Sequence, residues 1–371
     1  MLYVRDHLKA AGGSTYLLNT LPRFDPMRVR PSLCVLGPLQ PDYRPAPLDA
    51  LDVTFSSRTA RDPRRLLDLW RVARRVRPDL LLLSGPRSMV QGRLLARAIG
   101  VPSLLRLNFV FDVPPVQAHV QRWLSGPRHR VVAVSEAVRA WAARDFGLPA
   151  ESIEVVYPAH DWTRYGKTAA GVRSRLRKTL GIAPEASAVL LVGRLLLAEK
   201  GQDVMLKALP ALLFARPDTV LLLAGDGPDR IAAERLADEL GVAARVRFLG
   251  HREDVPDLLA ACDIVVAPST CEEAFGLVAL EAHAAGRPVV VSDAGGLAEV
   301  VTDEANGLHA RRGDPAALTA AVRRLLDDPA LARRLVERGR ADVQRFGLDA
   351  HMTRLTELCE RLARDPGNRN T

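Results

Sequence analysis

Two carboxylates with seven residues between them, Glu273 and Glu281, mark the part of this sequence with the greatest capacity for chemistry. A short apolar run before them, 264–267, predicts a buried strand. Gly276 stands between the two acids, directly before a predicted helix, 278–285, so that Glu273 falls on a loop and Glu281 inside the helix. Glycine lets the backbone N–H groups at a helix start approach an anion closely. The pattern predicts a site for a ligand that carries phosphate and several hydroxyl groups.

Basic residues after an earlier strand complement this chemistry. Gly193 and Arg194 directly follow the predicted strand 188–192, and Lys200 and Gly201 open the next helix. Arginine binds phosphate oxygens through its planar fork, whereas lysine binds them as a point charge. An arginine and a lysine near one helix N-terminus therefore suit a diphosphate.

Glycine-containing loops at other strand ends are weaker signals. The loop 224–228 (AGDGP) follows a strand, the segment 248–251 (FLGH) ends one and offers backbone on which a flat base can rest, and Gly12 and Gly13 follow a short first strand, 2–4. Each fits a simple turn as well as a close approach of the backbone to a ligand.

Motifs of other enzyme classes do not occur in the sequence. There is no GxSxG elbow, no HExxH, no GxxxxGK[ST] phosphate loop, and no GxGxxG after the first strand. The histidines are scattered, and the four cysteines lack CxxC spacing. We therefore expect reduced thiols and no metal site.

Short apolar runs alternate with helical patterns in both halves of the chain. This alternation predicts an α/β protein with two doubly wound, Rossmann-like domains that face each other across a cleft. The expected domains are 1–165 and 166–348, with the linker inside 158–181, and a final helix in 349–371 crosses back to the N-terminal domain. The predicted strands are 2–4, 79–83, 103–107, 131–134, 153–157, 188–192, 219–224, 245–249, 264–267 and 288–291.

Size and composition fit a globular protein. The chain has 371 residues, of which 48% are hydrophobic and 26% charged. No apolar run approaches the roughly 20 residues that span a bilayer, and the N-terminus lacks a signal-peptide pattern. We expect a cytoplasmic protein without a nucleic-acid partner. The short first strand also indicates that the natural start lies a few residues upstream of Met1.

The positive charge is concentrated in the first half. Residues 1–165 contain 24 Lys/Arg and 14 Asp/Glu, a net charge of +10, whereas residues 166–371 contain 28 and 29, a net charge of −1. The excess predicts an anionic acceptor or a peripheral contact with the anionic inner membrane face. Arginine-rich usage from a GC-rich genome explains the excess equally well.

The segment 64–77 is the most basic helical pattern. It fits a packed surface helix with solvated arginines, which we favour, or a helix that lies on anionic lipid. Its apolar stripe consists of Leu66, Leu69, Trp70, Ala73 and Val76.

Taken together, these motifs resemble glycosyltransferase family 4, the retaining nucleotide-sugar transferases of the GT-B fold, often called group 1. The resemblance covers nearly the whole chain and is strongest over 189–301. Its specific parts are the E-x7-E pattern with FGL inside, GRLLLAEKG (193–201), AGDGP (224–228), FLG (248–250) and PVVVSDAGGLAE (288–299), and the first half adds GGSTYL, VVAVSEAVR and VVYPAHDWTRY.

The resemblance implies an activity and a role for each motif residue. It implies a metal-independent hexosyltransferase that moves sugar from a UDP- or GDP-sugar to a hydroxyl of a glycan, a lipid-linked or a small-molecule acceptor, with no cofactor. Arg194 and Lys200 would bind the diphosphate and stabilise the leaving nucleotide, Glu273 would hold the donor sugar, and Glu281 the ribose. The remaining implied donor-binding residues are Gly12, Gly13, Gly250, His251, Phe275, Gly276 and Leu277.

The sequence departs from the family pattern in its first half. Asn108 stands where many members carry a histidine, and the usual PNGVD linker reads Pro158-Ala159-His160-Asp161. Asparagine can hydrogen-bond a sugar hydroxyl but cannot act as a base. Asn108 and His160 are candidates for acceptor binding, with purely structural loop roles as the alternative. Two other functions stay open. Nucleotide-sugar epimerases share the architecture that the resemblance implies, and Asn108 with the altered linker leaves room for a non-catalytic homologue that only binds nucleotide sugar.

Overall fold

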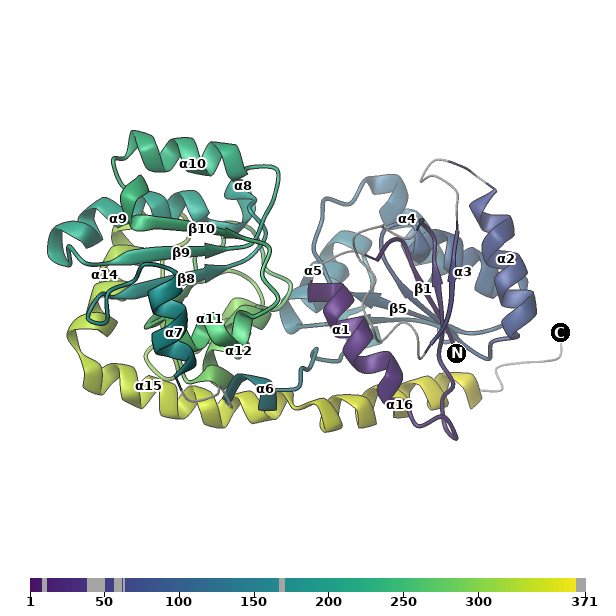
Figure 1. The fold of residues 1–371 in the computed structure, drawn as a ribbon. Coiled ribbons are helices and arrows are strands. Elements are labelled where there is room, and N and C mark those ends of the chain that lie inside the picture. The colour runs from purple at the N-terminus through teal and green to yellow at the C-terminus, as the bar shows by residue number, and fades with distance from the viewer. Residues whose placement is uncertain (9–11, 39–50, 57–61, 63, 167–170, 365–371) are drawn as a thin grey trace. The chain divides into compact units, whose positions relative to one another are not determined.

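The computed structural model describes residues 1–8, 12–38, 51–56, 62, 64–166 and 171–364. The chain divides into two compact units (Figure 1). The first unit comprises Met1–His160 and Phe346–Thr371, and the second comprises Asp161–Arg345. Each unit is a parallel sheet flanked by helices, which confirms the predicted α/β class with two Rossmann-like domains.

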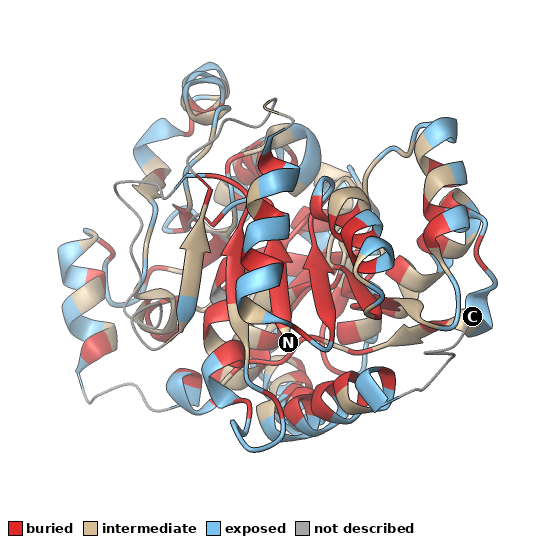
Figure 2. Cartoon of the chain, turned by 90° about the vertical axis from the view of Figure 1, so that its right-hand side faces the viewer, coloured by how far each residue is buried: buried red, intermediate tan, exposed pale blue. Residues whose placement is uncertain are grey.

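The first unit is built on a seven-stranded sheet in the order β3-β2-β1-β4-β5-β6-β7, in which every neighbouring pair is parallel. Its central strands are buried, as the red arrows of Figure 2 show, while the surrounding helices turn exposed faces outward. The strands are β1 (Leu2–Arg5), β2 (Ser32–Val35), β3 (Asp52–Phe55), β4 (Leu81–Ser84), β5 (Ser103–Leu107), β6 (His129–Ala133) and β7 (Ile153–Val155).

Helices connect these strands and cover the sheet. Ser135 caps the helix α5 (Glu136–Phe146): its hydroxyl oxygen accepts a hydrogen bond of 3.0 Å from the backbone N–H of Val138. The last helix, α16 (Leu348–Arg364), packs into the same hydrophobic core as β1 and β2 through one apolar stripe. The other helices are α1 (Gly12–Thr20), α2 (Arg65–Val76), α3 (Ser88–Ala98), α4 (Pro115–Leu124) and α5 (Glu136–Phe146).

The second unit contains a six-stranded parallel sheet in the order β10-β9-β8-β11-β12-β13. Its strands are β8 (Ala188–Val192), β9 (Val220–Ala224), β10 (Val246–Gly250), β11 (Ile264–Ala267), β12 (Val289–Ser292) and β13 (Leu308–Ala310). Its helices are α6 (Thr163–Gly166), α7 (Val172–Thr179), α8 (Leu197–Lys200), α9 (Gln202–Ala215), α10 (Arg230–Glu239), α11 (Val255–Ala261), α12 (Leu277–Ala285), α13 (Leu297–Val300), α14 (Pro315–Asp327) and α15 (Pro329–Asp342).

In both sheets the order in which successive strands are added reverses at an equivalent place. In each sheet the first strand of the unit lies between the second and the fourth, so the order changes hand between β1 and β4 and between β8 and β11. In open α/β sheets, ligands bind outside the carboxyl ends of the strands at such a switch point. The topology therefore directs attention to the loops after β8 and β11 in the second unit, and to those after β1 and β4 in the first.

Several elements differ from the sequence prediction. The short strands β2, β3 and β13 and the helices α4 and α7 were not predicted. The apolar stripe expected for α2 is wrong at two positions, because Leu66 and Trp70 are 39% and 40% exposed. The buried face of α2 consists instead of Arg65, Leu69, Val72 and Ala73. Among the residues described, no helix has the length and apolar character that crossing a membrane requires.

Candidate active site

The loops that follow β8 and β11 begin side by side at the switch point of the second unit. The two strands are hydrogen-bonded neighbours. Gly193 and Arg194 follow β8, while Pro268 and Ser269 follow β11 and lead to Glu273. The carboxyl ends of parallel strands meet at one sheet edge, so the predicted diphosphate residues and the loop bearing the first acid share that edge.

Lys200 and Glu273 form an ion pair at this edge. The Lys200 Nζ atom lies 2.5 Å from Glu273 Oε1, and the Ser269 hydroxyl donates a hydrogen bond of 2.6 Å to the same oxygen. Both side chains remain partly exposed, so a ligand can reach them. Gly201 permits the close approach: a Cβ atom there would lie 1.9 Å from the carbonyl oxygen of Pro268. The structure thus brings together two residues that the sequence placed in separate motifs.

Arg194 lies on an exposed loop that a glycine turn holds in place. The backbone N–H of Gly193 donates to the Ala224 carbonyl, at 2.9 Å, and the Arg194 carbonyl accepts from the side-chain amide of Gln202, at 2.8 Å. Gly225 has a φ of +144°, and a Cβ atom on it would lie 1.9 Å from the Gly193 carbonyl oxygen. The AGDGP turn therefore serves packing of the Arg194 loop. In the part of the chain that is described, no carboxylate pairs with the Arg194 guanidinium.

The amino end of α12 is built from glycines. Gly276 precedes the helix with a φ of +103°, and a Cβ atom on it would lie 2.6 Å from a Leu297 methyl carbon. A Cβ atom on Gly296 would lie 2.4 Å from the Phe275 Cα atom, so the two loops touch through their backbones. No side chain caps α12 at Gly276. Its first-turn N–H groups, which begin at Leu277, can therefore bind an anion.

Glu281 lies in the middle of α12 and is held by a residue that the sequence analysis missed. The Tyr165 hydroxyl, on α6, donates a hydrogen bond of 3.0 Å to Glu281 Oε1. Burial raises the pKa of Glu281 to about 7, while the Tyr165 hydrogen bond lowers this pKa by a smaller amount. The residue nevertheless keeps a partly exposed surface, which leaves it within reach of a ligand. Burial and the nearby Glu281 charge raise the pKa of Tyr165, so it is a neutral donor.

Gly250 and His251 follow at the end of β10. The Gly250 carbonyl accepts a hydrogen bond of 2.8 Å from the backbone N–H of Gly225, so this loop adjoins the turn that holds Arg194. His251 is exposed beside it. These two residues thus belong to the same edge of the sheet as the ion pair.

A second polar cluster lies at the carboxyl edge of the first unit. Arg5, at the end of β1, donates to the Gly13 carbonyl at 2.6 Å, and Ser84, at the end of β4, donates to the Asn108 side-chain oxygen at 3.3 Å. A Cβ atom on Gly13 would lie 3.0 Å from an Arg5 nitrogen and 3.2 Å from the Asn108 amide nitrogen. Gly12, beside Gly13, is the first residue of α1. Asn108 and the glycine pair are therefore neighbours.

The acid next to this cluster organises the backbone. Asp6 accepts hydrogen bonds from the N–H groups of Arg87 and Ser88, at 2.8 and 2.7 Å, and so binds the amino end of α3. Neither Arg5 nor Asp6 was predicted. The charged pair directly after the first strand was a signal that was available in the sequence.

His160 lies against α1 at the boundary of the first unit. Its Nε2 atom is 3.3 Å from the Asn19 amide nitrogen, and its backbone bridges to Gly347, next to the start of α16. His160 therefore sits where the chain leaves the first unit and later returns to it, and its side chain is buried.

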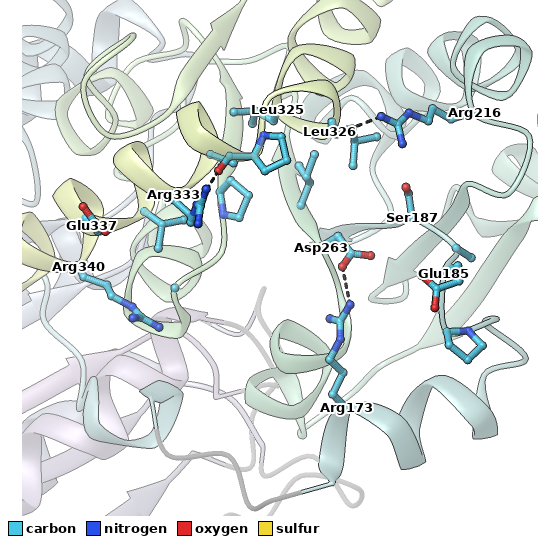
Figure 3. Close-up of a pocket in the computed structure, with 18 residues that line it drawn as sticks. Arg173, Glu185, Ser187, Arg216, Asp263, Leu325, Leu326, Arg333, Glu337 and Arg340 are labelled. Carbon is cyan, nitrogen blue, oxygen red and sulfur yellow. Dashed lines mark hydrogen bonds and ion pairs between the residues drawn. The ribbon is translucent and has the colours of Figure 1, made fainter.

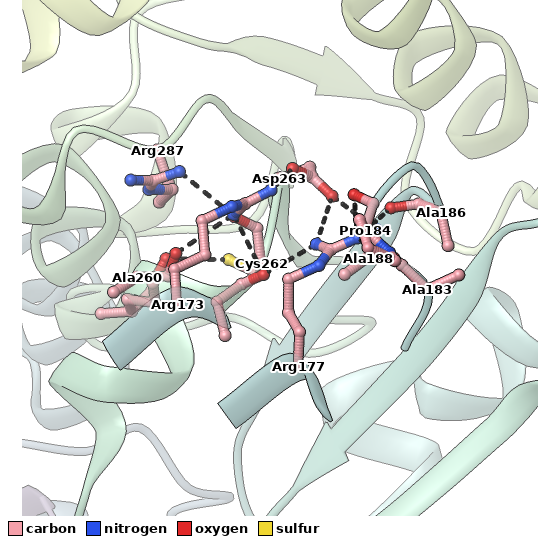
Figure 4. Close-up of polar contacts among 12 residues, drawn as sticks. Arg173, Arg177, Ala183, Pro184, Ala186, Ala188, Ala260, Cys262, Asp263 and Arg287 are labelled. Atoms are coloured by element: carbon pink, nitrogen blue, oxygen red, sulfur yellow. Dashed lines mark hydrogen bonds and ion pairs between the residues drawn. The ribbon is translucent and has the colours of Figure 1, made fainter. Parts of the chain in front are cut away.

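One pocket of the second unit lies away from the switch point. It has a volume of about 610 Å³ and lies at the opposite edge of the second sheet, where Ser187, Ile264 and Pro288 begin or precede their strands (Figure 3). The Asp263 carboxylate at this edge is already bound by groups of the protein: Arg173, Arg177 and the backbone N–H of Ala188 all donate hydrogen bonds to it (Figure 4). The candidate site therefore lies at the carboxyl edge, where the cationic and acidic side chains meet, and not at this pocket.

The described residues include no group of three or more His, Cys, Asp or Glu side chains that could hold a metal ion. At the carboxyl edge of the second unit, Arg194 and Lys200 supply positive charge.

The chain is similar to several proteins that are named as glycosyltransferases. A 2-deoxystreptamine glucosyltransferase of Streptomyces kanamyceticus is 31% identical and is matched over 66% of each chain. A D-inositol 3-phosphate glycosyltransferase of Nocardia farcinica is 38% identical over 60% of this chain and 51% of its own. The chain spans about half the length of most such curated relatives. The crystal structure of Anabaena HepE in complex with UDP-glucose superposes with a TM-score of 0.83 at 25% identity, over 96% of this chain and 98% of that one.

Two family descriptions cover most of the sequence. Residues 10–164 match the description "Glycosyltransferase Family 4", and residues 172–342 match "Glycosyl transferases group 1". The first match covers most of the first unit and ends four residues into the second, and the second match lies within the second unit. The chain therefore belongs to the group 1 family of glycosyltransferases, as its motifs predict.

Proposed function

We propose that this protein is a retaining glycosyltransferase that moves a hexose-type sugar from a UDP- or GDP-sugar to a hydroxyl group of an acceptor, without a metal ion. The observation that carries the proposal is the ion pair of Lys200 and Glu273 beside the uncapped amino end of α12. Lys200 and Arg194 supply positive charge, and the start of α12 supplies backbone N–H donors. These groups follow strands at the switch point of the sheet, where a diphosphate is expected to bind.

Each donor group then has a chemical task. Arg194, Lys200 and the backbone from Phe275 to Leu277 bind the diphosphate and stabilise the negative charge that grows on it as the glycosidic bond breaks. Glu273 binds hydroxyls of the donor sugar and Glu281 those of the ribose. The loop with Gly250 and His251 binds the base.

The transfer step requires alignment more than a strong base. The acceptor oxygen forms a bond to the anomeric carbon on the face from which the diphosphate leaves, and the leaving phosphate oxygen takes the acceptor proton. Holding the reacting groups in place supplies much of the rate enhancement. Asn108 can orient an acceptor hydroxyl by hydrogen bonding, and its contacts with Ser84 and Gly13 support this role.

A nucleotide-sugar panel tests the proposal directly. We expect isothermal titration to detect binding of UDP or GDP and their sugars, with unchanged affinity in excess EDTA because cationic side chains replace the metal. Failure to bind every UDP- and GDP-sugar would contradict the proposal. Release of an epimerised donor without an acceptor would indicate the epimerase alternative. Binding without turnover on any acceptor would indicate a non-catalytic homologue.

We also propose that the first unit contacts anionic lipid, which would bring it to a lipid-linked acceptor. Helices α2, α3 and α4 pack side by side. Two exposed tryptophans on this face each carry a stacked arginine, Arg74 on Trp70 at 4.9 Å and Arg97 on Trp123 at 5.0 Å. Tryptophan favours the interface between water and lipid, and arginine attracts anionic head groups. The exposed apolar residues on these helices are Leu66, Leu67, Trp70, Leu94, Val116 and Trp123.

Vesicle binding checks the lipid contact. We expect the double variant Arg74→Gln/Arg97→Gln to bind phosphatidylserine-containing vesicles roughly 30-fold more weakly, because each arginine near the surface contributes about 1 kcal/mol. Added salt should weaken binding of the wild-type chain. Arg235→Gln, an exposed arginine of the second unit, is the matched control. Equal binding to neutral and anionic vesicles in co-sedimentation would refute the contact.

A further inference from the structure

We propose that Tyr165 is a positioning residue for the Glu281 carboxylate, holding it ionised and oriented for the ribose of the nucleotide. The inference rests on the proposed function, because it takes Glu281 as the ribose ligand. Its starting point is the hydrogen bond of 3.0 Å from the Tyr165 hydroxyl to Glu281 Oε1. This bond joins residues that are 116 positions apart in the sequence.

Packing fixes Tyr165 in place. Its side chain is on α6, the short helix that opens the second unit, and α6 packs against α12, which carries Glu281. Tyr165 is only 7% exposed, and the Trp162 ring lies 6.0 Å from its own ring. A phenol held in this way has few alternative rotamers, so it acts as a fixed donor toward the carboxylate.

The geometry leaves room for a ligand. A carboxylate has two oxygens and about four acceptor positions. The Tyr165 hydroxyl uses one position, on Oε1, and no hydrogen bond to Oε2 is present among the described residues. Two vicinal ribose hydroxyls can therefore bind the remaining positions while Tyr165 stays bound. The tyrosine and the nucleotide act on the same group without competing for one site.

The electrostatics explain why such a donor is useful. Burial disfavours the charged form of Glu281 and raises its pKa to about 7, whereas the Tyr165 hydroxyl acts in the opposite direction. The helices α11, α13 and α15 and the strands β11 and β12 also contact α12, but none contributes a described charged group that shifts the Glu281 pKa. Arg164, beside Tyr165 on α6, acts on the tyrosine. Tyr165 is thus the described group that favours the ionised carboxylate.

Tyr165→Phe separates this role from a structural one. At pH 7 we expect the variant to bind UDP about tenfold more weakly, because a hydrogen bond to a charged group is lost. Inorganic pyrophosphate, which has no ribose, should bind as before. The pH midpoint of UDP affinity should move upward, since Glu281 then ionises at higher pH. GDP replaces UDP as the probe if the wild-type chain binds only GDP.

Two comparisons make the test decisive. Tyr3→Phe removes another buried tyrosine hydroxyl, one that has no hydrogen-bond partner among the described residues, and should change neither ligand's affinity. In a Glu281→Gln background, Tyr165→Phe should have no further effect on the pH midpoint. An unchanged UDP affinity and pH midpoint in Tyr165→Phe, or equal weakening of UDP and pyrophosphate, would overturn the inference alone. Absence of UDP and GDP binding by the wild-type chain would overturn the proposed function as well.

Discussion

Replacing Lys200 with alanine is expected to lower the turnover number by about 10²- to 10³-fold, the usual loss when one group that stabilises transition-state charge is removed. The Lys200 ammonium lies at the switch point, 2.5 Å from Oε1 of Glu273, a residue of the loop that leads into α12. In the proposed metal-independent reaction, no metal ion compensates for the lost positive charge. Because the charge grows as the bond breaks, we expect turnover to fall more than donor affinity.

The matched control is a second lysine of the same region. Lys207, on α9, makes an exposed ion pair with Asp203 at 2.8 Å, and its replacement by alanine should leave turnover unchanged. Steady-state kinetics on the donor identified by the binding panel would measure both variants. A Lys200→Ala enzyme with wild-type turnover would show that the diphosphate does not bind at this edge.

Loss of Lys200 should also reveal how Glu273 is held. The Ser269 hydroxyl donates to the same carboxylate oxygen, at 2.6 Å, and remains after the substitution. The acid therefore keeps one partner, so the fold should persist and the kinetic loss should report on the missing charge. Arg194 differs from Lys200 in this respect, because it pairs with no described carboxylate. Replacing Arg194 should therefore affect only its interaction with the ligand.

Local patterns predicted the centre of the second unit well. The strands 188–192 and 264–267 were predicted with the bounds that the structure has, because strands buried on both faces read as continuous apolar runs. The glycines around α12 were recognisable for a similar reason. Where a Cβ atom would meet backbone, as at Gly276 and Gly296, the residue type is dictated by local geometry.

Edge strands and distant partners could not be predicted in this way. β3 is only four residues long and incompletely buried, so its apolar signal is weak, and β13 has three residues. Tyr165 was missed because its partner is 116 positions away, and no local spacing reports such a bond. The exposed side of α2 was misjudged because Val72, and not Trp70, lies on the buried face of the helix. The roles assigned to the site residues remain predictions.

Replacing Glu281 with glutamine is expected to stabilise the protein above pH 7 while abolishing tight nucleotide binding. The ordinary pKa of a glutamate is 4.5, and burial raises that of Glu281 to about 7 in the folded state. Between these values the folded protein binds more protons than the unfolded chain, so the free energy of unfolding falls as the pH rises through this window. Above pH 7 the folded protein bears the full free-energy cost of burying the ionised Glu281 side chain. Glutamine carries no charge and removes this cost.

The expected gain is roughly 2 kcal/mol at pH 8, which is the free energy of the pKa shift reduced for the partial exposure of the residue. The gain should disappear below about pH 4.5, where Glu281 is protonated and neutral in both the folded and the unfolded protein. Glutamine retains an oxygen that can accept the Tyr165 hydrogen bond, so the packing of α6 on α12 should persist. Urea unfolding followed by circular dichroism at pH 5 and pH 8 would measure the difference, with the exposed Glu239→Gln as the control.

An unchanged stability at pH 8 would mean that Glu281 is not destabilised when it is ionised, and that its pKa is not raised. A gain in stability together with unchanged UDP and GDP affinity would support the raised pKa of Glu281. It would also show that Glu281 does not bind the nucleotide. A gain in stability with lost affinity is the expected pair of results. It would mean that a buried carboxylate, costly to the fold, is kept because the ribose of the donor requires it.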